Sequence, residues 1–184
     1  MDIKIHQILM GSRANGPGNR NVVWFQGCTL DCPGCFNPQT HAANSGKKIS
    51  ADKLGTLLLG SPGENDGITI SGGEPFQQPE GLLELLQYLK ERQSPPILVF
   101  SGYTLKEIQN DPARSACLPY IDALICGRFC REFPPDYAHF CSSSNQSLIL
   151  NTPRFKETDF CNLTLQELIV ENGHVIISGI FSRS

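Results

Sequence analysis

The sequence has no long apolar run and no strong excess of charge of one sign. No stretch approaches the roughly 18 apolar residues that a membrane-spanning helix needs, so we expect no membrane segment. The net charge of -3 and the pI near 5.8 leave no basic surface for nucleic acid, so we expect none as a partner. The first 18 residues lack the charged start, apolar stretch and cleavage site of a signal peptide. These absences predict a protein of the cytoplasm.

The chain also contains no internal repeat, low-complexity tract or linker. Its 184 residues are enough for one domain with a sizeable core. The hydrophobic content of 40% and the charged content of 18% are ordinary for a globular protein. We therefore predict a single domain over residues 1–184.

Eight cysteines need an explanation. Without a secretory signal, a metal or redox role is favoured over disulfides. Cys28, Cys32 and Cys35 form a C-x3-C-x2-C run, and three thiolates this close in sequence can reach one metal centre. The other five are expected to be small buried residues, although a second metal centre on four of them is an alternative. These five are Cys117 and the four candidate ligands Cys126, Cys130, Cys141 and Cys161.

The clustered cysteines leave a metal centre one protein ligand short. A [4Fe–4S] cluster is normally held by four cysteines, so three indicate one cluster with an iron open to a substrate or cofactor. The alternative is a zinc site with His41 as the fourth ligand. Because three clustered cysteines without a second C-x2-C pair are a poor pattern for structural zinc, the cluster is favoured.

Short apolar strands alternate with helical segments through the first two-thirds of the chain. Strands are predicted over 3–9, 22–25, 68–70, 97–100 and 121–125. A helix is predicted after Ser50 as N-cap, with Leu54, Leu57 and Leu58 on its apolar face. A second helix is predicted from Pro79 onward. A third is predicted near 104–109, with Thr104 and Glu107 as a capping box. Residues 127–147 are predicted to be a long functional loop, and Asn172-Gly173 to be the turn of a β-hairpin.

This alternation is typical of an α/β fold with a parallel sheet and crossover helices. A closed eight-fold barrel needs about 250 residues, or roughly 31 per unit, so this chain has room for about six units. We therefore predict an open partial (β/α)6-type barrel with a C-terminal β-hairpin.

Four further residues are candidates for binding. Gly72 and Gly73 follow a predicted strand, where missing side chains let the backbone approach a ligand closely. Ser101 comes at the end of the next strand, where ligands of open α/β sheets sit, but it is equally an ordinary strand-end serine. Arg20 precedes the cysteine loop, and its guanidinium could steady a carboxylate or position a partner's loop.

The cysteine run, followed by Ser71-Gly72-Gly73-Glu74-Pro75, resembles the radical S-adenosylmethionine (SAM) superfamily. The segments 15–20 and 22–28 resemble the lead-in to the cluster in the glycyl-radical-enzyme activases. Segments 121–129 and 143–146 are similar to activases of anaerobic ribonucleotide reductases. The likeness covers roughly residues 5–150, so the tail from about residue 151 is expected to be variable.

The resemblance implies a partial barrel of the radical SAM kind, with a cluster loop at 27–45 and a SAM-binding loop at 71–75. It implies that Cys28, Cys32 and Cys35 hold the cluster while SAM binds the open iron, and it assigns no catalytic residue beyond the cluster. The implied contacts to SAM are Phe36, Asn37, Ser71, Gly72, Gly73, Glu74 and Ser101.

The implied reaction is the reductive cleavage of SAM to a 5′-deoxyadenosyl radical, which generates a glycyl radical on a partner enzyme. The partner would be a glycyl-radical enzyme similar to anaerobic ribonucleotide reductase, and the electron donor a flavodoxin or ferredoxin. One alternative is a short radical SAM enzyme acting on a small molecule or peptide, as in carboxy-deazaguanine synthases. Another is a non-catalytic iron–sulfur or zinc module.

Overall fold

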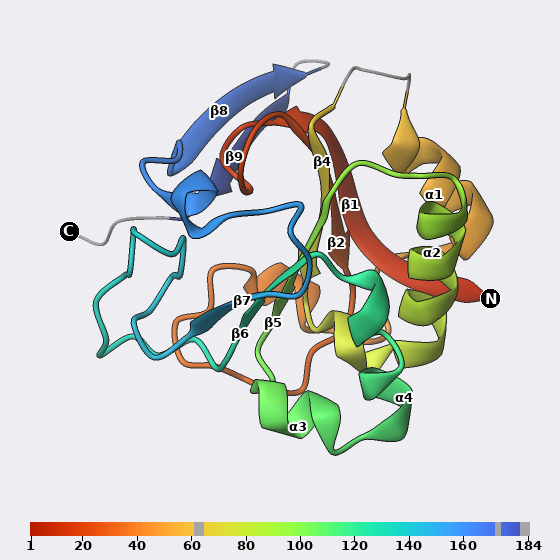
Figure 1. Ribbon diagram of the computed structural model, residues 1–184, viewed down its shortest axis with the longest axis horizontal. Helices are drawn as coiled ribbons and strands as arrows, with labels where there is room; N and C mark the ends of the chain where they lie inside the picture. The colour runs from red at the N-terminus through yellow and green to blue at the C-terminus, as the bar shows by residue number, and fades with distance from the viewer. Residues whose placement is uncertain (61–64, 172–173, 181–184) are drawn as a thin grey trace.

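A seven-stranded sheet forms the centre of the protein, with the strand order β3-β1-β2-β4-β5-β6-β7 (Figure 1). The computed structural model describes residues 1–60, 65–171 and 174–180. The strands of this sheet are β1 (Asp2–Ser12), β2 (Arg20–Phe25), β3 (Lys47–Ser50), β4 (Gly67–Gly72), β5 (Ile97–Ser101), β6 (Ala123–Cys126) and β7 (Ser147–Leu150). The α-helices are α1 (Ala51–Leu59), α2 (Pro79–Glu91), α3 (Leu105–Gln109) and α4 (Pro112–Ser115). A separate two-stranded hairpin consists of β8 (Gln166–Glu171) and β9 (His174–Gly179).

The four central strands of the large sheet are parallel. Strand β2 pairs with β4, β4 with β5, and β5 with β6, each in parallel register. The pairings of β1 with β2 and β3, and of β6 with β7, are antiparallel. Because the carboxyl ends of parallel neighbours meet at one edge, the segments that follow these four strands lie together there.

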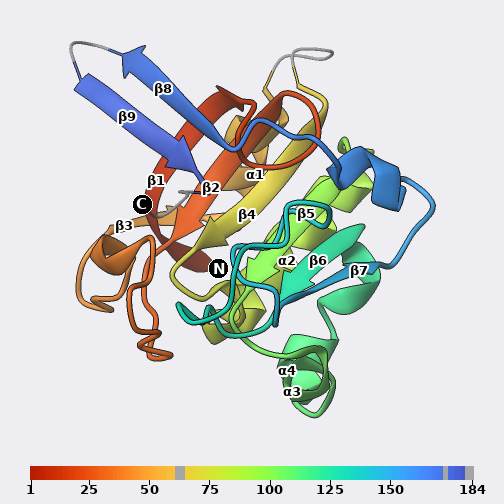
Figure 2. The ribbon, with the colours of Figure 1, turned by 90° about the vertical axis from the view of Figure 1, so that its left-hand side faces the viewer.

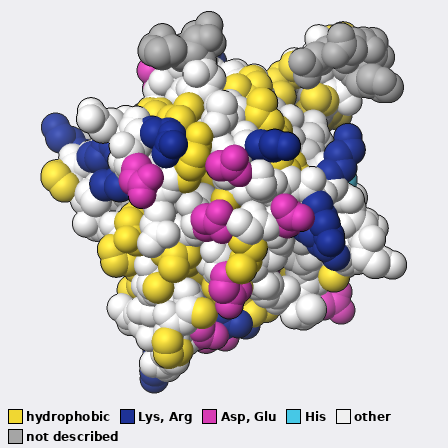
Figure 3. Space-filling model, turned by 90° about the vertical axis from the view of Figure 1, so that its right-hand side faces the viewer, with side chains coloured by type: hydrophobic (Ala, Val, Ile, Leu, Met, Phe, Trp, Pro, Cys, Tyr) yellow, Lys and Arg dark blue, Asp and Glu magenta, His cyan; other side chains and the backbone are white. Residues whose placement is uncertain are grey.

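Helices α1 and α2 cover one face of the sheet, as Figure 1 shows. Fully buried side chains of the strands, such as Phe25 and Ile70, form the main hydrophobic core with helical residues such as Leu54 and Leu86. The outer surface on this side carries lysine and arginine side chains interspersed with acidic ones (Figure 3). This surface therefore presents mixed charge rather than a field of one sign.

The opposite face of the sheet is covered by loops and by the C-terminal segment instead of by α-helices (Figure 2). Phe140, Phe155 and Phe160 form a second buried cluster there with Leu98 and Ile125 of the sheet. The hairpin β8–β9 lies on the same side of the molecule. A sheet with helices on one face only leaves the other face available for a site.

Arg20, at the start of β2, is fully buried. Its guanidinium donates to the carbonyl oxygens of Pro17, Ile68 and Pro96 at 2.6–3.0 Å and to the Thr69 hydroxyl at 2.6 Å. Burial lowers the pKa of Arg20 to about 9. The expectation that Arg20 steadies a carboxylate or positions a partner's loop is wrong, because its donors bind the backbone around the starts of β4 and β5.

The predicted helices are present, but one side chain, Leu57, faces solvent instead of the core. Helix α2 begins at Pro79 as predicted, and Thr104 and Glu107 form the capping box of α3. Ser50 takes the N-cap position of α1, although its side chain makes no capping hydrogen bond. Leu57 was predicted on the apolar face of α1 but is 50% exposed, because the helix packs through the side that carries Leu58.

The α/β class, the parallel central strands and the C-terminal hairpin are confirmed. Strands β8 and β9 pair in antiparallel register from Gln166–Gly179 onward, and the predicted turn at Asn172-Gly173 lies outside the described residues. Strands β3 and β7 were not predicted, and each adds an antiparallel pairing to the sheet. Residues 127–146 form a long irregular loop, with an isolated bridge between Asp136 and Cys141. Within the described part of the chain, the helices are too short or too polar to cross a membrane.

Candidate cluster and cofactor site

The loops at the carboxyl edge of the parallel strands surround an open cavity, which we call the cysteine cavity. Its walls come from the loop after β2, the loop after β4, the end of β5 and the long loop after β6. All the residues predicted for cluster and SAM binding line it, and these are Cys28, Cys32, Cys35, Phe36, Asn37, Ser71, Gly72, Gly73, Glu74 and Ser101. The fold therefore brings together positions that lie up to 73 residues apart in the sequence.

The three clustered cysteines are free thiols, each partly exposed in this cavity. The loop that carries them is held by backbone hydrogen bonds, including Cys28 N–H to the His41 carbonyl oxygen at 3.1 Å and Cys35 N–H to the Cys32 carbonyl oxygen at 3.1 Å. The N–H of Asn37 also donates to the Cys35 Sγ at 3.4 Å. Such a donor stabilises negative charge on sulfur, which suits a thiolate ligand.

Burial raises the pKa of Cys28 and of Cys35 above that of a free thiol. The thiols are therefore protonated at neutral pH until a metal centre displaces their protons. Partial burial also limits the access of water to whatever the sulfurs bind. The donor set consequently fits a buried, thiolate-ligated metal centre.

No group of three or more His, Cys, Asp or Glu side chains in the described residues converges on a point that could hold a single metal ion. The zinc alternative, with His41 as fourth ligand, therefore has no assembled site here, although His41 does line the cavity. A four-iron cluster makes a different demand, because each of its cysteine ligands binds a separate iron. No single-ion site is assembled in the described residues on the alternative second set, Cys126, Cys130, Cys141 and Cys161, of which two are buried and Cys161 is exposed.

The two glycines of the loop after β4 are explained by backbone packing. A Cβ on Gly72, whose φ is +115°, would lie 2.2 Å from the backbone nitrogen of Phe25. A Cβ on Gly73 would lie 2.3 Å from the carbonyl oxygen of Gly27. Instead, Gly73 N–H donates to the Phe25 carbonyl oxygen at 2.9 Å, so the loop is stacked directly on the start of the cysteine loop. The missing side chains bring these two loops together and also leave backbone exposed to the cavity.

Glu74 is fully buried and joins the loop after β4 to the end of β5. Its carboxylate accepts hydrogen bonds from the N–H of Phe76 at 3.0 Å, the N–H of Gly102 at 2.7 Å and the hydroxyl of Ser101 at 2.9 Å. Burial raises the pKa of Glu74 to about 7, against the opposing effect of these hydrogen bonds. Its side chain therefore organises the wall of the cavity.

Ser101 is largely committed to the protein itself. Its hydroxyl donates to Glu74 and accepts from the N–H of Tyr103 at 3.0 Å, and the residue is 6% exposed. These contacts are those of a strand-end serine that shapes the cavity. The resemblance-based role of Ser101 as a contact to SAM stays a prediction.

The long loop after β6 closes the cavity on the side away from β2. The Phe129 ring packs against Phe36 with the ring centroids 4.9 Å apart. The side chain of Gln146 donates to the Gly127 carbonyl oxygen at 3.0 Å. Arg128 bonds the carbonyl oxygen of Gly102 and forms an ion pair with Glu107 at 2.9 Å. The predicted functional loop is therefore fixed to the site, and Arg128 supports the wall that contains Gly102.

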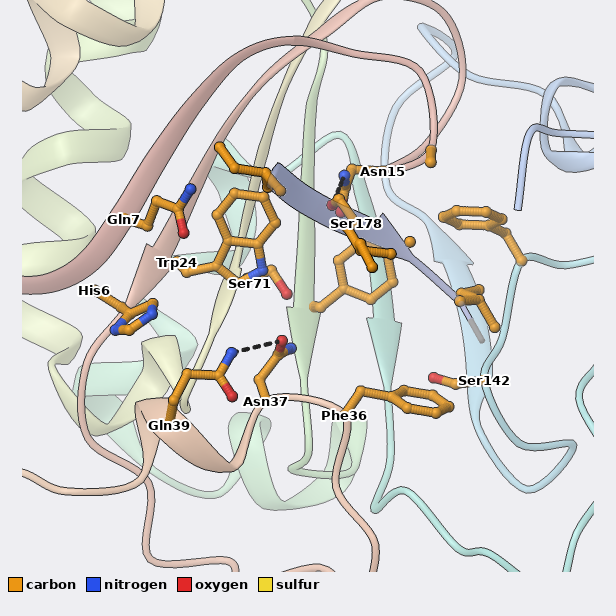
Figure 4. A pocket seen from close by; sticks show the side chains of 17 residues that line it. His6, Gln7, Asn15, Trp24, Phe36, Asn37, Gln39, Ser71, Ser142 and Ser178 are labelled. Carbon is orange, nitrogen blue, oxygen red and sulfur yellow. Dashed lines mark hydrogen bonds between the residues drawn. The ribbon is translucent and has the colours of Figure 1, made fainter. Parts of the chain in front are cut away.

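A second cavity adjoins the first, and sequence reasoning missed it. This hairpin cavity lies between the hairpin strand β9 and the face of the sheet opposite the helices. Figure 4 shows Trp24 and Ser71 on the sheet side and Ser178 on the hairpin side. Strand alternation was the available signal, since Phe25 faces the helices and its neighbour Trp24 must face the other way. The position of the hairpin could not be inferred from that pattern.

Comparison with known proteins places this geometry in a family. A family model described as a 4Fe-4S single cluster domain matches residues 14–149. The anaerobic ribonucleoside-triphosphate reductase-activating protein of Vibrio cholerae is 33% identical over 147 residues, which is 77% of this chain and 94% of that protein. Its Escherichia coli counterpart is 32% identical over the same shares. The pyruvate formate-lyase-activating enzyme of Clostridium pasteurianum is 39% identical over 104 residues, which is 54% of this chain and 44% of that protein. The chain therefore belongs to the radical SAM activases of glycyl-radical enzymes and carries the 4Fe-4S domain of that family.

Proposed function

We propose that this activase generates a glycyl radical on an enzyme of the anaerobic ribonucleoside-triphosphate reductase type, using SAM as its radical source. The observation that carries the proposal is the cysteine cavity, where the clustered thiols and the Ser71–Glu74 loop share one space. The relatives that match most of the chain are named for this reductase, which supports the choice of partner.

In this proposal Cys28, Cys32 and Cys35 are the three protein ligands of one [4Fe–4S] cluster, and one iron is left open to SAM. When bound and reduced, the cluster supplies the electron that splits SAM into methionine and a 5′-deoxyadenosyl radical, which takes a hydrogen atom from the glycine. The protein provides the thiolates, the N–H of Asn37 beside Cys35, and partial burial of the sulfurs.

The predicted contacts to SAM come from both sides of the cysteine cavity. Exposed backbone of Gly72 and Gly73 offers hydrogen-bonding groups to a polar ligand, while the Phe36 ring provides an apolar wall. We assign Asn37, Ser71, Glu74 and Ser101 to the same binding region, with Glu74 and Ser101 acting mainly by holding the wall. Supporting this, all seven residues line one cavity with the cysteines.

Three further elements belong to the proposal. We take residues 1–184 as one domain whose curved sheet is an open partial barrel of the radical SAM kind. We place the protein in the cytoplasm, and we expect a flavodoxin or ferredoxin as the electron donor.

The test is an anaerobic assay of SAM cleavage. The full chain is reconstituted with iron and sulfide, reduced with dithionite and mixed with SAM, and 5′-deoxyadenosine is quantified. We expect product from the wild-type chain and none from Cys32→Ala. Cys161→Ala is the matched control, because it removes an exposed thiol that does not line the cavity.

The partner is tested by adding the anaerobic ribonucleoside-triphosphate reductase of the same organism and recording the glycyl-radical signal by electron paramagnetic resonance. Cleavage of SAM without a signal on that reductase would reject the partner and keep the chemistry. Binding of zinc with no iron–sulfur absorption would reject the chemistry as well.

A further inference from the structure

The hairpin cavity is directly continuous with the cysteine cavity. The two share Phe36, Asn37, Ser71, Phe100 and Ser142 in their walls. A group in the hairpin cavity therefore lies beside whatever occupies the cysteine cavity. This is the position from which a substrate could meet a radical formed there.

The lining of the hairpin cavity mixes polar and apolar side chains, and among the described residues it carries no carboxylate, ammonium or guanidinium, so that His6 is its one basic side chain. Side-chain amides face it from Gln7, Asn15, Asn37 and Gln39, with aromatic rings such as Trp24 between them (Figure 4). Amides donate and accept hydrogen bonds at once, as peptide groups do. A phosphate or carboxylate would find no permanent opposite charge here, whereas an uncharged polypeptide backbone would find matching partners.

The hairpin that walls this cavity is held in place by the loop between β1 and β2. The Asn15 side chain donates to the Ser178 hydroxyl at 2.7 Å. The Glu167 carboxylate accepts from the Arg13 N–H at 2.9 Å and from the Ser12 hydroxyl. These bonds tie β8 and β9 to the sheet and fix the width of the cavity.

The hairpin lies outside the segment that the family shares. The family match ends at residue 149, whereas β9 begins at His174. The hairpin therefore adds to the common site a wall that is not part of the matched domain.

We propose that the hairpin β8–β9 selects the substrate, with β9 forming one wall of a groove that takes an uncharged extended polypeptide segment of the partner enzyme. This inference rests on the proposed function, because it assumes that the radical formed in the cysteine cavity acts on a polypeptide. Ile176 lines the groove and is partly buried, so a charge placed at this position of β9 would enter the groove.

The experiment introduces charge on either side of β9. Ile176→Glu puts a carboxylate into the groove, and Ile176→Gln matches its shape without the charge. Val175→Glu places the same charge one residue earlier, on a side chain that is 59% exposed and does not line the groove. For each reconstituted variant, glycyl radical formed on the reductase is divided by 5′-deoxyadenosine released.

We expect this ratio to fall about tenfold or more in Ile176→Glu, because an unpaired charge in the groove opposes a neutral partner. Ile176→Gln and Val175→Glu should stay within about twofold of the wild type, since neither adds a charge to the groove. An unchanged ratio in Ile176→Glu would overturn the proposal. An equal fall in Ile176→Gln would also overturn it, because the effect would then be one of shape or folding.

A binding measurement keeps the inference separate from the proposed function. Trp24 is the only tryptophan of the chain and lines the groove, so its fluorescence reports occupancy without any reaction. The reconstituted chain is titrated with a blocked pentapeptide of serine and alanine around a central glycine, and with the same peptide carrying aspartates in place of serines.

The uncharged peptide should bind at least about tenfold more tightly than the acidic one, and Ile176→Glu should weaken its binding about tenfold while the acidic peptide binds more weakly still. Equal binding of both peptides, or no binding of either, would reject the groove even if SAM is cleaved. A preference for the uncharged peptide in a chain that cleaves no SAM would keep the groove and reject the proposed function.

Discussion

The carboxylate of Glu74 is the residue on which the cavity wall most depends. It receives hydrogen bonds from Phe76, Ser101 and Gly102, and so connects segments that follow two different strands. A buried group with this many donors holds them in one arrangement, because any donor left without its partner would lose a hydrogen bond in a place that water does not reach. Glu74 thus acts on ligands of the cavity through the backbone that it positions.

The titration of Glu74 makes stability depend on pH in a defined direction. Its folded pKa, about 7, lies above the ordinary value of 4.5, so the folded apoprotein binds more protons between these values. The stability that this contributes is fully present below about pH 4.5 and is lost as pH rises through about 7. Urea unfolding of the reduced apoprotein at a series of pH values measures this contribution to the free energy of unfolding, which is on the order of 3 kcal/mol. In Glu74→Gln we expect this pH-dependent contribution to disappear. Glu91→Gln, at an exposed side chain, should keep the wild-type slope.

Arg20 carries a second prediction at this scale. Its guanidinium satisfies backbone carbonyls of Pro17, Ile68 and Pro96. Arg20→Ala should lower the free energy of unfolding by roughly 3 kcal/mol or more, because buried acceptors lose their donors. Arg20→Lys should recover only part of this loss, since an ammonium cannot reproduce the planar fork. Urea unfolding measures both, and full recovery in Arg20→Lys would contradict the geometry.

At the scale of single residues, the sequence predicts the position of the site correctly but predicts the role of Arg20 incorrectly. The spacing of Cys28, Cys32 and Cys35 and the loop at Gly72 and Gly73 lead to one cavity. Arg20 is predicted to steady a carboxylate or position a partner's loop because it precedes the cysteine loop and carries a guanidinium. Its burial depends on the carbonyl groups of Ile68 in β4 and of Pro96 just before β5, which are remote in sequence and therefore invisible in the local pattern.

At the scale of elements, helix α1 offers a test between neighbouring leucines. Leu58 is fully buried in the main core, whereas Leu57 is 50% exposed. Leu58→Ala should cost about 2–5 kcal/mol of stability because it leaves a cavity in packed surroundings. Leu57→Ala should stay within about 0.5 kcal/mol of the wild type. Thermal or urea unfolding compares the two, and similar losses would mean that α1 packs through a different side.

The elements that sequence reasoning missed are the edge strands. Strand β3 contains Lys47 and Lys48, which are exposed, and β7 is only four residues long. Both owe their strand conformation to pairing with a neighbour, β3 with β1 and β7 with β6, more than to their own side chains. The central strands were found because burial on both faces produces continuous apolar runs.

For the whole molecule, the three clustered cysteines lie outside the hydrophobic cores, although Leu30 and Phe36 of the same loop pack against them. None of Cys28, Cys32 or Cys35 belongs to the two clusters of buried residues that the structure describes. Removal of the metal centre should therefore leave a folded protein, in contrast to a zinc finger, whose fold depends on its metal. We expect far-UV circular dichroism and cooperative unfolding to persist after chelation, while amide exchange accelerates in residues 27–45. Exchange that also accelerates throughout α2 would show that the metal supports the core.

The walls of the cysteine cavity come from the segments after β2, β4, β5 and β6, and this has a consequence for how the protein matures. A nascent chain that has just emerged as far as Cys35 holds the three clustered thiols but none of the opposing wall. Parallel strand pairs form late, because they join residues far apart in sequence. The pocket is complete only once the loop through Gln146 has been synthesised and docked. We therefore expect iron delivery to follow translation. A protein that delivered iron earlier would meet the three thiols before the opposite wall of their cavity had formed.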